Sequence, residues 1–190
     1  SFAVSTPFGL VVAAYAALQA TYTLVLKHHA ILDAMAISAG FVLRAVAGAV
    51  AIAVPVSQWL LLCTFLLALF LALAKRRHEL TFLEGVAEAH RPALGEYTLG
   101  FIDAMLSTTA AATIVAYALY TIEPGTGEAY PHLMLTVPFV IYGLFRYLSL
   151  VHQNNLGGSP EEILLSDRPL IIDLLAWGVV TAVILYVLPS

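Results

Sequence analysis

Six long apolar runs divide the chain, and they constrain its fold more than any other feature. Each is close to the roughly 20 residues that a helix needs to cross a bilayer. Membrane barrel strands are about half as long and alternate in polarity, so helices are expected. Charged residues form only 11% of the chain, against roughly 25% in soluble domains. We predict an all-α, polytopic membrane protein, a single transmembrane domain over residues 1–190, with spans at about 8–26, 31–54, 59–74, 99–122, 133–150 and 170–187.

The basic residues predict how these spans are oriented. Every lysine and arginine except Arg44 lies in or beside one of three connections, expected at residues 27–30, 75–98 and 151–169. The other two connections and both ends of the sequence carry none. Positively charged loops stay on the cytoplasmic side. The three basic connections are therefore expected at the cytoplasmic face of a plasma membrane of the bacterial type.

The most highly charged connection, residues 74–97, is a candidate for holding a polar substrate. Its charges are interleaved, with Lys75, Arg76, Arg77 and Arg91 among Glu79, Glu84, Glu88 and Glu96. Lysine binds phosphate as a compact charge and arginine as a planar fork. Attraction to anionic lipid headgroups is the alternative. The acids favour a site, because carboxylates suit a magnesium ion beside a pyrophosphate.

One arginine lies where lipid is expected. Arg44 is in the middle of the second span, and Asp33 lies eleven residues earlier on nearly the same face of a helix. An arginine within the membrane costs roughly 3 kcal/mol or more unless it meets a polar cavity or a partner. We expect Asp33 and Arg44 to share an enclosed polar cavity. The alternative is a structural pair between Arg44 and an acid such as Asp103 or Asp173.

Proline and serine predict helix starts and a bend. Pro138 is expected to kink the fifth span. In the last basic connection, Ser159-Pro160 and Ser166-Asp167-Arg168-Pro169 are typical of N-caps followed by a first helical turn. An exposed loop explains this capping, but it does not explain why Arg146 and Arg168 flank the same connection.

Three passages resemble the UbiA superfamily of intramembrane prenyltransferases, in particular its decaprenyl-phosphate phosphoribosyltransferase branch. They are YTLVLKHHAILDAMAISAGFVLRAVAG (22–48), AKRRHEL (74–80) followed by Arg91 and Tyr97, and FRYLSLVHQNNLGGSPEEILLSDRPL (145–170). Members of that family have nine transmembrane helices, and this chain resembles the last six. The family's aspartate-rich NDxxDxxxD motif, which binds magnesium and diphosphate, does not occur here. It is expected upstream of Ser1, together with the first three helices.

The resemblance implies transfer of 5-phosphoribose from phosphoribosyl pyrophosphate to a polyprenyl phosphate, with Mg²⁺ as cofactor. It implies Arg44 at the floor of the pocket, with Asp33 and Glu79 as polar organisers or metal-side ligands. Phosphate contacts are expected from Lys27, Lys75, Arg76 and Arg91, and as second choices from Tyr97, Arg146, Asp167 and Arg168. The polyprenyl tail is expected in an apolar groove between helices.

Two other functions remain open. One is a UbiA-type prenyltransferase that uses a prenyl diphosphate and an aromatic or other acceptor, although the carboxylate-poor first basic connection favours phosphoribosyl transfer. The other is a non-catalytic subunit of a larger membrane complex. A homo-oligomer also remains open, and no nucleic-acid partner is expected.

Overall fold

The computed structural model describes residues 6–82, 97–153 and 160–188. The regular elements of these residues are all helices, and six of the helices are long and apolar enough to cross a membrane. The long helices are α1 (Thr6–Leu24), α2 (Leu32–Ala51), α3 (Gln58–Phe82), α5 (Leu99–Ile122), α7 (Val137–Gln153) and α9 (Arg168–Tyr186). Shorter helical segments are η1 (Leu26–His28), α6 (Pro124–Ala129), η3 (Leu133–Thr136) and α8 (Pro160–Ser166). The prediction of an all-α protein with six spans is confirmed.

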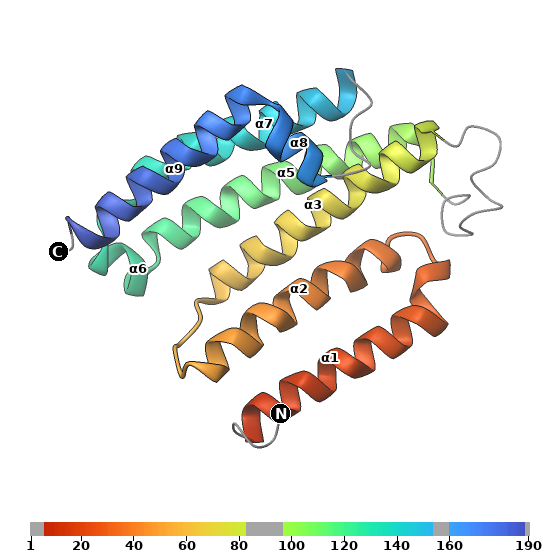
Figure 1. The fold of residues 1–190 in the computed structure, drawn as a ribbon, viewed down its shortest axis with the longest axis horizontal. Coiled ribbons are helices and arrows are strands. Elements are labelled where there is room, and N and C mark those ends of the chain that lie inside the picture. Colours follow the sequence, from red (N-terminus) through yellow and green to blue (C-terminus); the bar gives the residue numbers. More distant parts are fainter. Residues whose placement is uncertain (1–5, 83–96, 154–159, 189–190) are drawn as a thin grey trace.

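The long helices lie side by side in chain order, each packed against the next (Figure 1). Successive long helices run in opposite directions, so the ends of α1, α3 and α7 and the starts of α2, α5 and α9 lie at the same end of the bundle. The ends of α1 and α3 lie on the right in Figure 1. We call this end the basic end, because the described lysines and arginines other than Arg44 lie in or near it.

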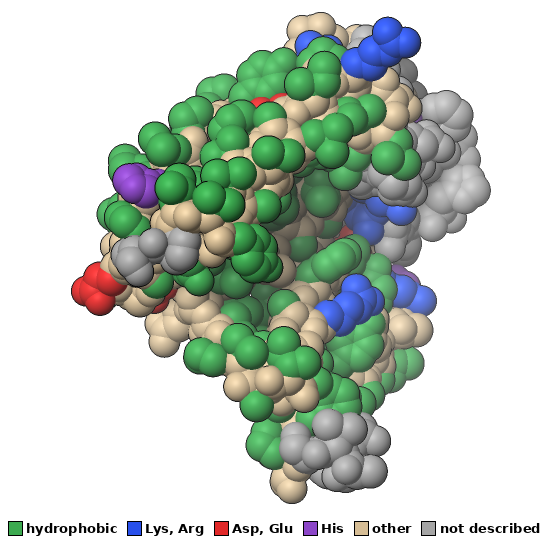
Figure 2. All heavy atoms as spheres, turned by 60° about the vertical axis from the view of Figure 1, so that its left-hand side comes forward, with side chains coloured by type: hydrophobic (Ala, Val, Ile, Leu, Met, Phe, Trp, Pro, Cys, Tyr) green, Lys and Arg blue, Asp and Glu red, His purple; other side chains and the backbone are tan. Residues whose placement is uncertain are grey.

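The core lies where α3 and α5 meet their neighbours. Leu73 of α3 and Ile102 and Leu106 of α5 have no exposed surface, and the ring of Phe70 lies 5.4 Å from that of Tyr147 on α7. The outer helices leave large apolar side chains uncovered, and hydrophobic atoms cover most of the face in Figure 2. An apolar surface of this extent would associate in water, whereas a bilayer solvates it. The chain is an integral membrane protein.

Three boundaries differ from those expected. Helix α3 continues to Phe82 instead of ending near residue 74, because lysine, arginine and glutamate are good helix formers and the helix does not stop where its sequence becomes charged. Pro138 falls in the first turn of α7, after η3, where its missing N–H costs no helical bond. The fifth span changes from 3-10 helix to α-helix beside Pro138, and the expected kink there stays a prediction. The side chain of Asp167, rather than that of Ser166, caps α9 by accepting from the Leu170 N–H at 3.0 Å.

Candidate functional site

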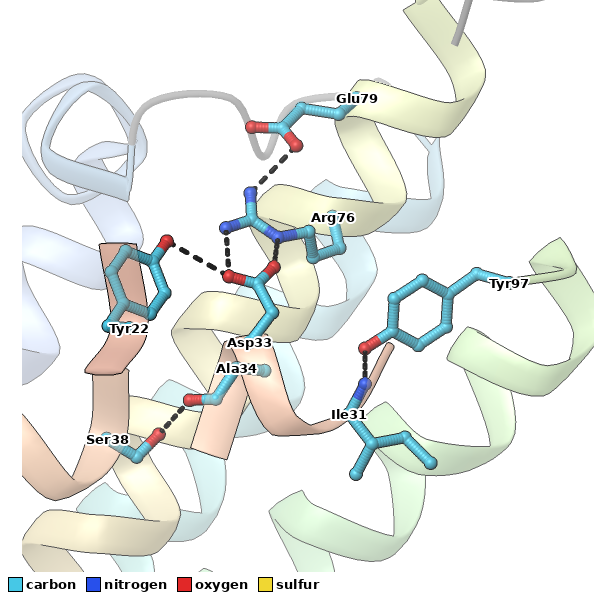
Figure 3. A network of polar contacts seen from close by, with 8 residues as sticks. All are labelled: Tyr22, Ile31, Asp33, Ala34, Ser38, Arg76, Glu79 and Tyr97. Carbon is cyan, nitrogen blue, oxygen red and sulfur yellow. Dashed lines mark hydrogen bonds and ion pairs between the residues drawn. The ribbon is translucent and has the colours of Figure 1, made fainter. Parts of the chain in front are cut away.

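A buried polar network joins α2 to α3 at the basic end (Figure 3). Asp33, in the first turn of α2, accepts from Arg76 Nε at 2.7 Å and, at a long 3.4 Å, from Nη2. Arg76 Nη1 donates to Glu79 Oε2 at 2.7 Å, and the Tyr22 hydroxyl donates to Asp33 Oδ1 at 3.0 Å. Asp33 has no exposed surface and Arg76 is 2% exposed. The structure thus brings together three residues that the sequence nominated from two separate passages.

The charges of this network determine what Arg76 can do. Two carboxylates, those of Asp33 and Glu79, accept from one guanidinium, so the three groups together carry one net negative charge. A buried arginine balanced in this way has favourable charge-assisted hydrogen bonds, and its charge is not presented to an incoming phosphate. The arrangement favours Arg76 as an organiser of the site over a direct phosphate ligand.

Two lysines lie close along the chain to members of the network and differ from Arg76 in their charge balance. Lys27 lies in η1, between α1 and α2, and is half-buried, while Lys75 precedes Arg76 in α3 and is exposed. Within the described part of the chain, no hydrogen bond or ion pair links either ammonium group to another residue. Unlike Arg76, both lysines keep their charge available. Arg91, the remaining first-choice phosphate contact, lies outside the described residues.

Arg44 and Asp33 do not share a cavity, so this expectation is wrong. Asp33 is enclosed by the network with Arg76, whereas Arg44 is exposed and donates to the Tyr15 hydroxyl at 2.6 Å. The guanidinium carbon of Arg44 also lies 5.2 Å and 5.1 Å from the ring centroids of Tyr15 and Phe41. Eleven residues of helix separate Arg44 from Asp33 by about 16 Å along the axis. A shared helix face therefore did not imply a shared cavity.

A second cluster ties three helices together, and sequence reasoning did not nominate its arginine. Arg77 Nε donates to Asp103 Oδ1 at 2.6 Å, and Arg77 Nη1 donates to the Val151 carbonyl at 3.1 Å. The same Asp103 oxygen lies 3.2 Å from His152 Nε2. Arg77 follows Arg76 by one residue, so it points about 100° away around α3 and meets α5 and α7 instead of α2. This offset of about 100° could have predicted that Arg76 and Arg77 face different helices. It applies only if α3 continues past residue 74, which the sequence did not predict.

A third cluster fixes the start of α9. Arg146 of α7 donates to Asp167 through Nε at 3.1 Å and Nη2 at 2.7 Å. These hydrogen bonds, together with the Leu170 N–H, hold the pKa of the Asp167 carboxyl below its usual range. Arg168 is exposed. Of the acids considered as partners of Arg44, Asp103 pairs with Arg77, and Asp173 is buried beside Gly143 of α7.

The described residues do not fit a magnesium site. They include no group of three or more histidine, cysteine, aspartate or glutamate residues that could hold a metal ion. Asp33, a nominated metal-side ligand, already accepts from Arg76 and Tyr22 and has no exposed surface. Tyr97, nominated as a phosphate contact, is also buried, and its hydroxyl accepts from the Ile31 N–H.

An apolar groove lies away from this network. It runs between η3 and the second half of α9, with a volume of about 310 Å³, and is lined by residues such as Leu135, Val183 and Ile184. These segments are at the end of the bundle opposite the basic end. The groove therefore does not open beside the Asp33–Arg76–Glu79 network.

Fold and site together define a polytopic helical membrane protein with a buried ionic network at one end. The chain is 35% identical over 187 residues to decaprenyl-phosphate phosphoribosyltransferase of Mycolicibacterium smegmatis, covering 93% of this chain and 58% of that protein. The enzyme of the same name from Corynebacterium glutamicum is 34% identical over 182 residues, and that from Mycobacterium tuberculosis is 34% identical over 168. No model of a known protein family matches.

These proteins are homologues of the chain, and they confirm the resemblance read from its sequence. The similarity covers 88% to 94% of this chain but only 54% to 58% of the three relatives. The chain therefore spans little more than half the length of the proteins it matches.

Proposed function

We propose that the protein is a membrane transferase that moves 5-phosphoribose from phosphoribosyl pyrophosphate to a polyprenyl phosphate. A phosphate oxygen of the lipid attacks the anomeric carbon of the ribose. The bond from that carbon to pyrophosphate breaks, and pyrophosphate leaves with the bonding electrons. The observation that carries the proposal is the similarity, over nearly the whole chain, to relatives named as decaprenyl-phosphate phosphoribosyltransferases.

The geometry of the basic end supports this chemistry. Negative charge develops on the departing pyrophosphate, and preformed positive groups aimed at it lower the barrier. Lys27 and Lys75 are the candidates for this role, since neither is neutralised by a described residue. The Asp33–Arg76–Glu79 network would fix the start of α2 against α3, and with it the positions of the two lysines. The positive-inside pattern supports a site on the cytoplasmic face.

We further propose Mg²⁺ as the cofactor, with ligands other than the described residues, which include no group of three or more histidine, cysteine, aspartate or glutamate residues that could hold a metal ion. If the enzyme requires Mg²⁺, its ligands lie outside those residues. Activity should disappear when EDTA is added and return with excess Mg²⁺. Unchanged activity in EDTA would contradict the proposal.

The direct test uses the full-length natural protein in lipid nanodiscs. Phosphoribosyl pyrophosphate labelled in the ribose is incubated with decaprenyl phosphate, and label extracted into the organic phase is counted. We expect label in the lipid and release of pyrophosphate in equal amount. Lys27→Gln with Lys75→Gln should greatly reduce transfer, whereas the charge-preserving Lys27→Arg with Lys75→Arg should retain more of it.

The same preparation distinguishes the alternatives. Incorporation of a labelled prenyl group from prenyl diphosphate into an aromatic acceptor, without phosphoribosyl transfer, would favour the prenyltransferase. A folded protein with neither activity would favour a non-catalytic subunit. Assembly as a homo-oligomer or in a larger complex remains a separate prediction.

A further inference from the structure

The residue that begins α2 has an unusual backbone. Ile31 has φ 65° and ψ −54°, and the Leu32 N–H donates to the Ala30 carbonyl at 2.7 Å across it. These angles and this hydrogen bond define a γ-turn with positive φ, which is rare and strained. A β-branched residue is among the least suited to positive φ. Such a conformation persists only where its surroundings impose it.

The surroundings include a tyrosine that is distant in sequence. The Ile31 N–H donates to the hydroxyl of Tyr97, which lies 66 positions along the chain, just before α5 (Figure 3). Tyr97 is 5% exposed, and its ring stacks on Phe101 with centroids 6.3 Å apart. The phenol is therefore held in place from the α5 side, and its oxygen satisfies an N–H that α2 itself leaves unpaired.

This turn separates two parts of the candidate site. Lys27 lies four residues before Ile31, and Asp33 lies two residues after it. Asp33 is bound to Arg76, which fixes the α2 side of the turn against α3. The backbone angles at Ile31 therefore set where η1, with Lys27, lies relative to the buried ion pair. Relaxation to negative φ would reorient one side against the other.

We propose that Tyr97 is a positioning residue that holds the γ-turn at Ala30–Leu32, and so aligns Lys27 with the Asp33–Arg76 pair for a phosphate-bearing substrate. Its hydroxyl acts on the backbone of the turn instead of on the substrate. The proposal rests on the proposed function for the identity of the substrate. The inference that Tyr97 holds the turn does not depend on the proposed function.

The test combines Tyr97→Phe with Ile31→Gly, because glycine adopts positive φ without strain. In the full-length protein, Tyr97→Phe should speed hydrogen–deuterium exchange in the peptide that contains the turn. It should also raise the KM for phosphoribosyl pyrophosphate by roughly tenfold, the scale expected when one buried hydrogen bond is lost, with a smaller change in kcat. The double variant should lower the KM most of the way back to the wild-type value. Glycine at position 31 adopts the positive φ of the turn without help from the Tyr97 hydroxyl.

Tyr186→Phe is the matched control, since Tyr186 is 84% exposed near the end of α9. It should change neither exchange nor KM. A merely structural role for Tyr97 would lower the amount of active protein without moving KM, and glycine would not rescue it. The proposal is overturned if Tyr97→Phe leaves exchange and KM unchanged, or if the double variant is no better than Tyr97→Phe. If the wild-type protein transfers no phosphoribose, the proposed function fails, while the exchange data still decide whether Tyr97 holds the turn.

Discussion

Removing one member of the buried Asp33–Arg76 pair should destabilise the protein far more than removing one member of an exposed ion pair. Arg76→Gln removes the guanidinium that donates two hydrogen bonds to the Asp33 carboxylate, which has no exposed surface. Breaking a buried pair in this way costs about 3–5 kcal/mol. Asp33→Asn should cost less, about 3 kcal/mol or below, because Glu79 still accepts from Arg76 at 2.7 Å. The double variant should lose less than the sum, with a coupling of about 2 kcal/mol.

The free energy of unfolding can be measured by titration with SDS in mixed micelles, followed by circular dichroism. Asp167→Asn is the matched control, because the Arg146–Asp167 pair is partly exposed, at 34% and 14%. It should cost about 1 kcal/mol or less from the partly exposed ion pair, because asparagine caps a helix about as well as aspartate. Additive effects of Asp33→Asn and Arg76→Gln, or single losses below about 0.5 kcal/mol, would refute a buried pair as the element that joins α2 to α3.

Three further outcomes are expected. Lys27→Gln and Lys75→Gln should each raise the KM for phosphoribosyl pyrophosphate in the transfer assay without lowering the melting temperature; a fall in melting temperature with unchanged KM would contradict their proposed role. Because the pKa of Asp167 is lowered, chiefly by hydrogen bonds from Arg146, its stabilising contribution is fully present above the unfolded pKa of about 3.9 and disappears as pH falls through the folded value. Arg146→Gln should therefore flatten the acid side of a profile of melting temperature against pH, and an unchanged slope would argue against the pair. Thr98→Ala removes the N-cap that accepts from the Phe101 N–H at 3.2 Å and should cost about 1 kcal/mol, measured by the same SDS titration.

The architecture was largely predictable from the sequence, because length and apolarity determine what can cross a bilayer. The runs around α5 and α9 predicted those helices to within about two residues at each end. The alternation of basic and neutral connections predicted which ends of the helices lie together. Hydropathy could not predict that α3 continues eight residues beyond its apolar run, because a helix depends on backbone hydrogen bonds and its charged turns remain good helix formers.

The pairing of charges was less predictable. Arg76 and Arg77 are adjacent, yet one binds Asp33 of α2 and the other binds Asp103 of α5. Which acid each arginine binds depends on which helices pack on either side of α3. The spacing of residues along the sequence does not give that information. Arg44 illustrates the converse, since a shared helix face with Asp33 suggested a common polar cavity, whereas Asp33 is buried and Arg44 is exposed. The strained turn at Ile31 has no sequence signal, because isoleucine there argues against positive φ.

The most direct test concerns where the phosphates of the substrate bind. A cryo-electron microscopy map of the full-length natural protein with phosphoribosyl pyrophosphate would provide that test. We predict density for the pyrophosphate group at the basic end, within reach of Lys27 and Lys75, with Arg76 still held between Asp33 and Glu79. Density for that group away from the basic end, or a phosphate bound directly by Arg76 with the Asp33 contact broken, would contradict the account.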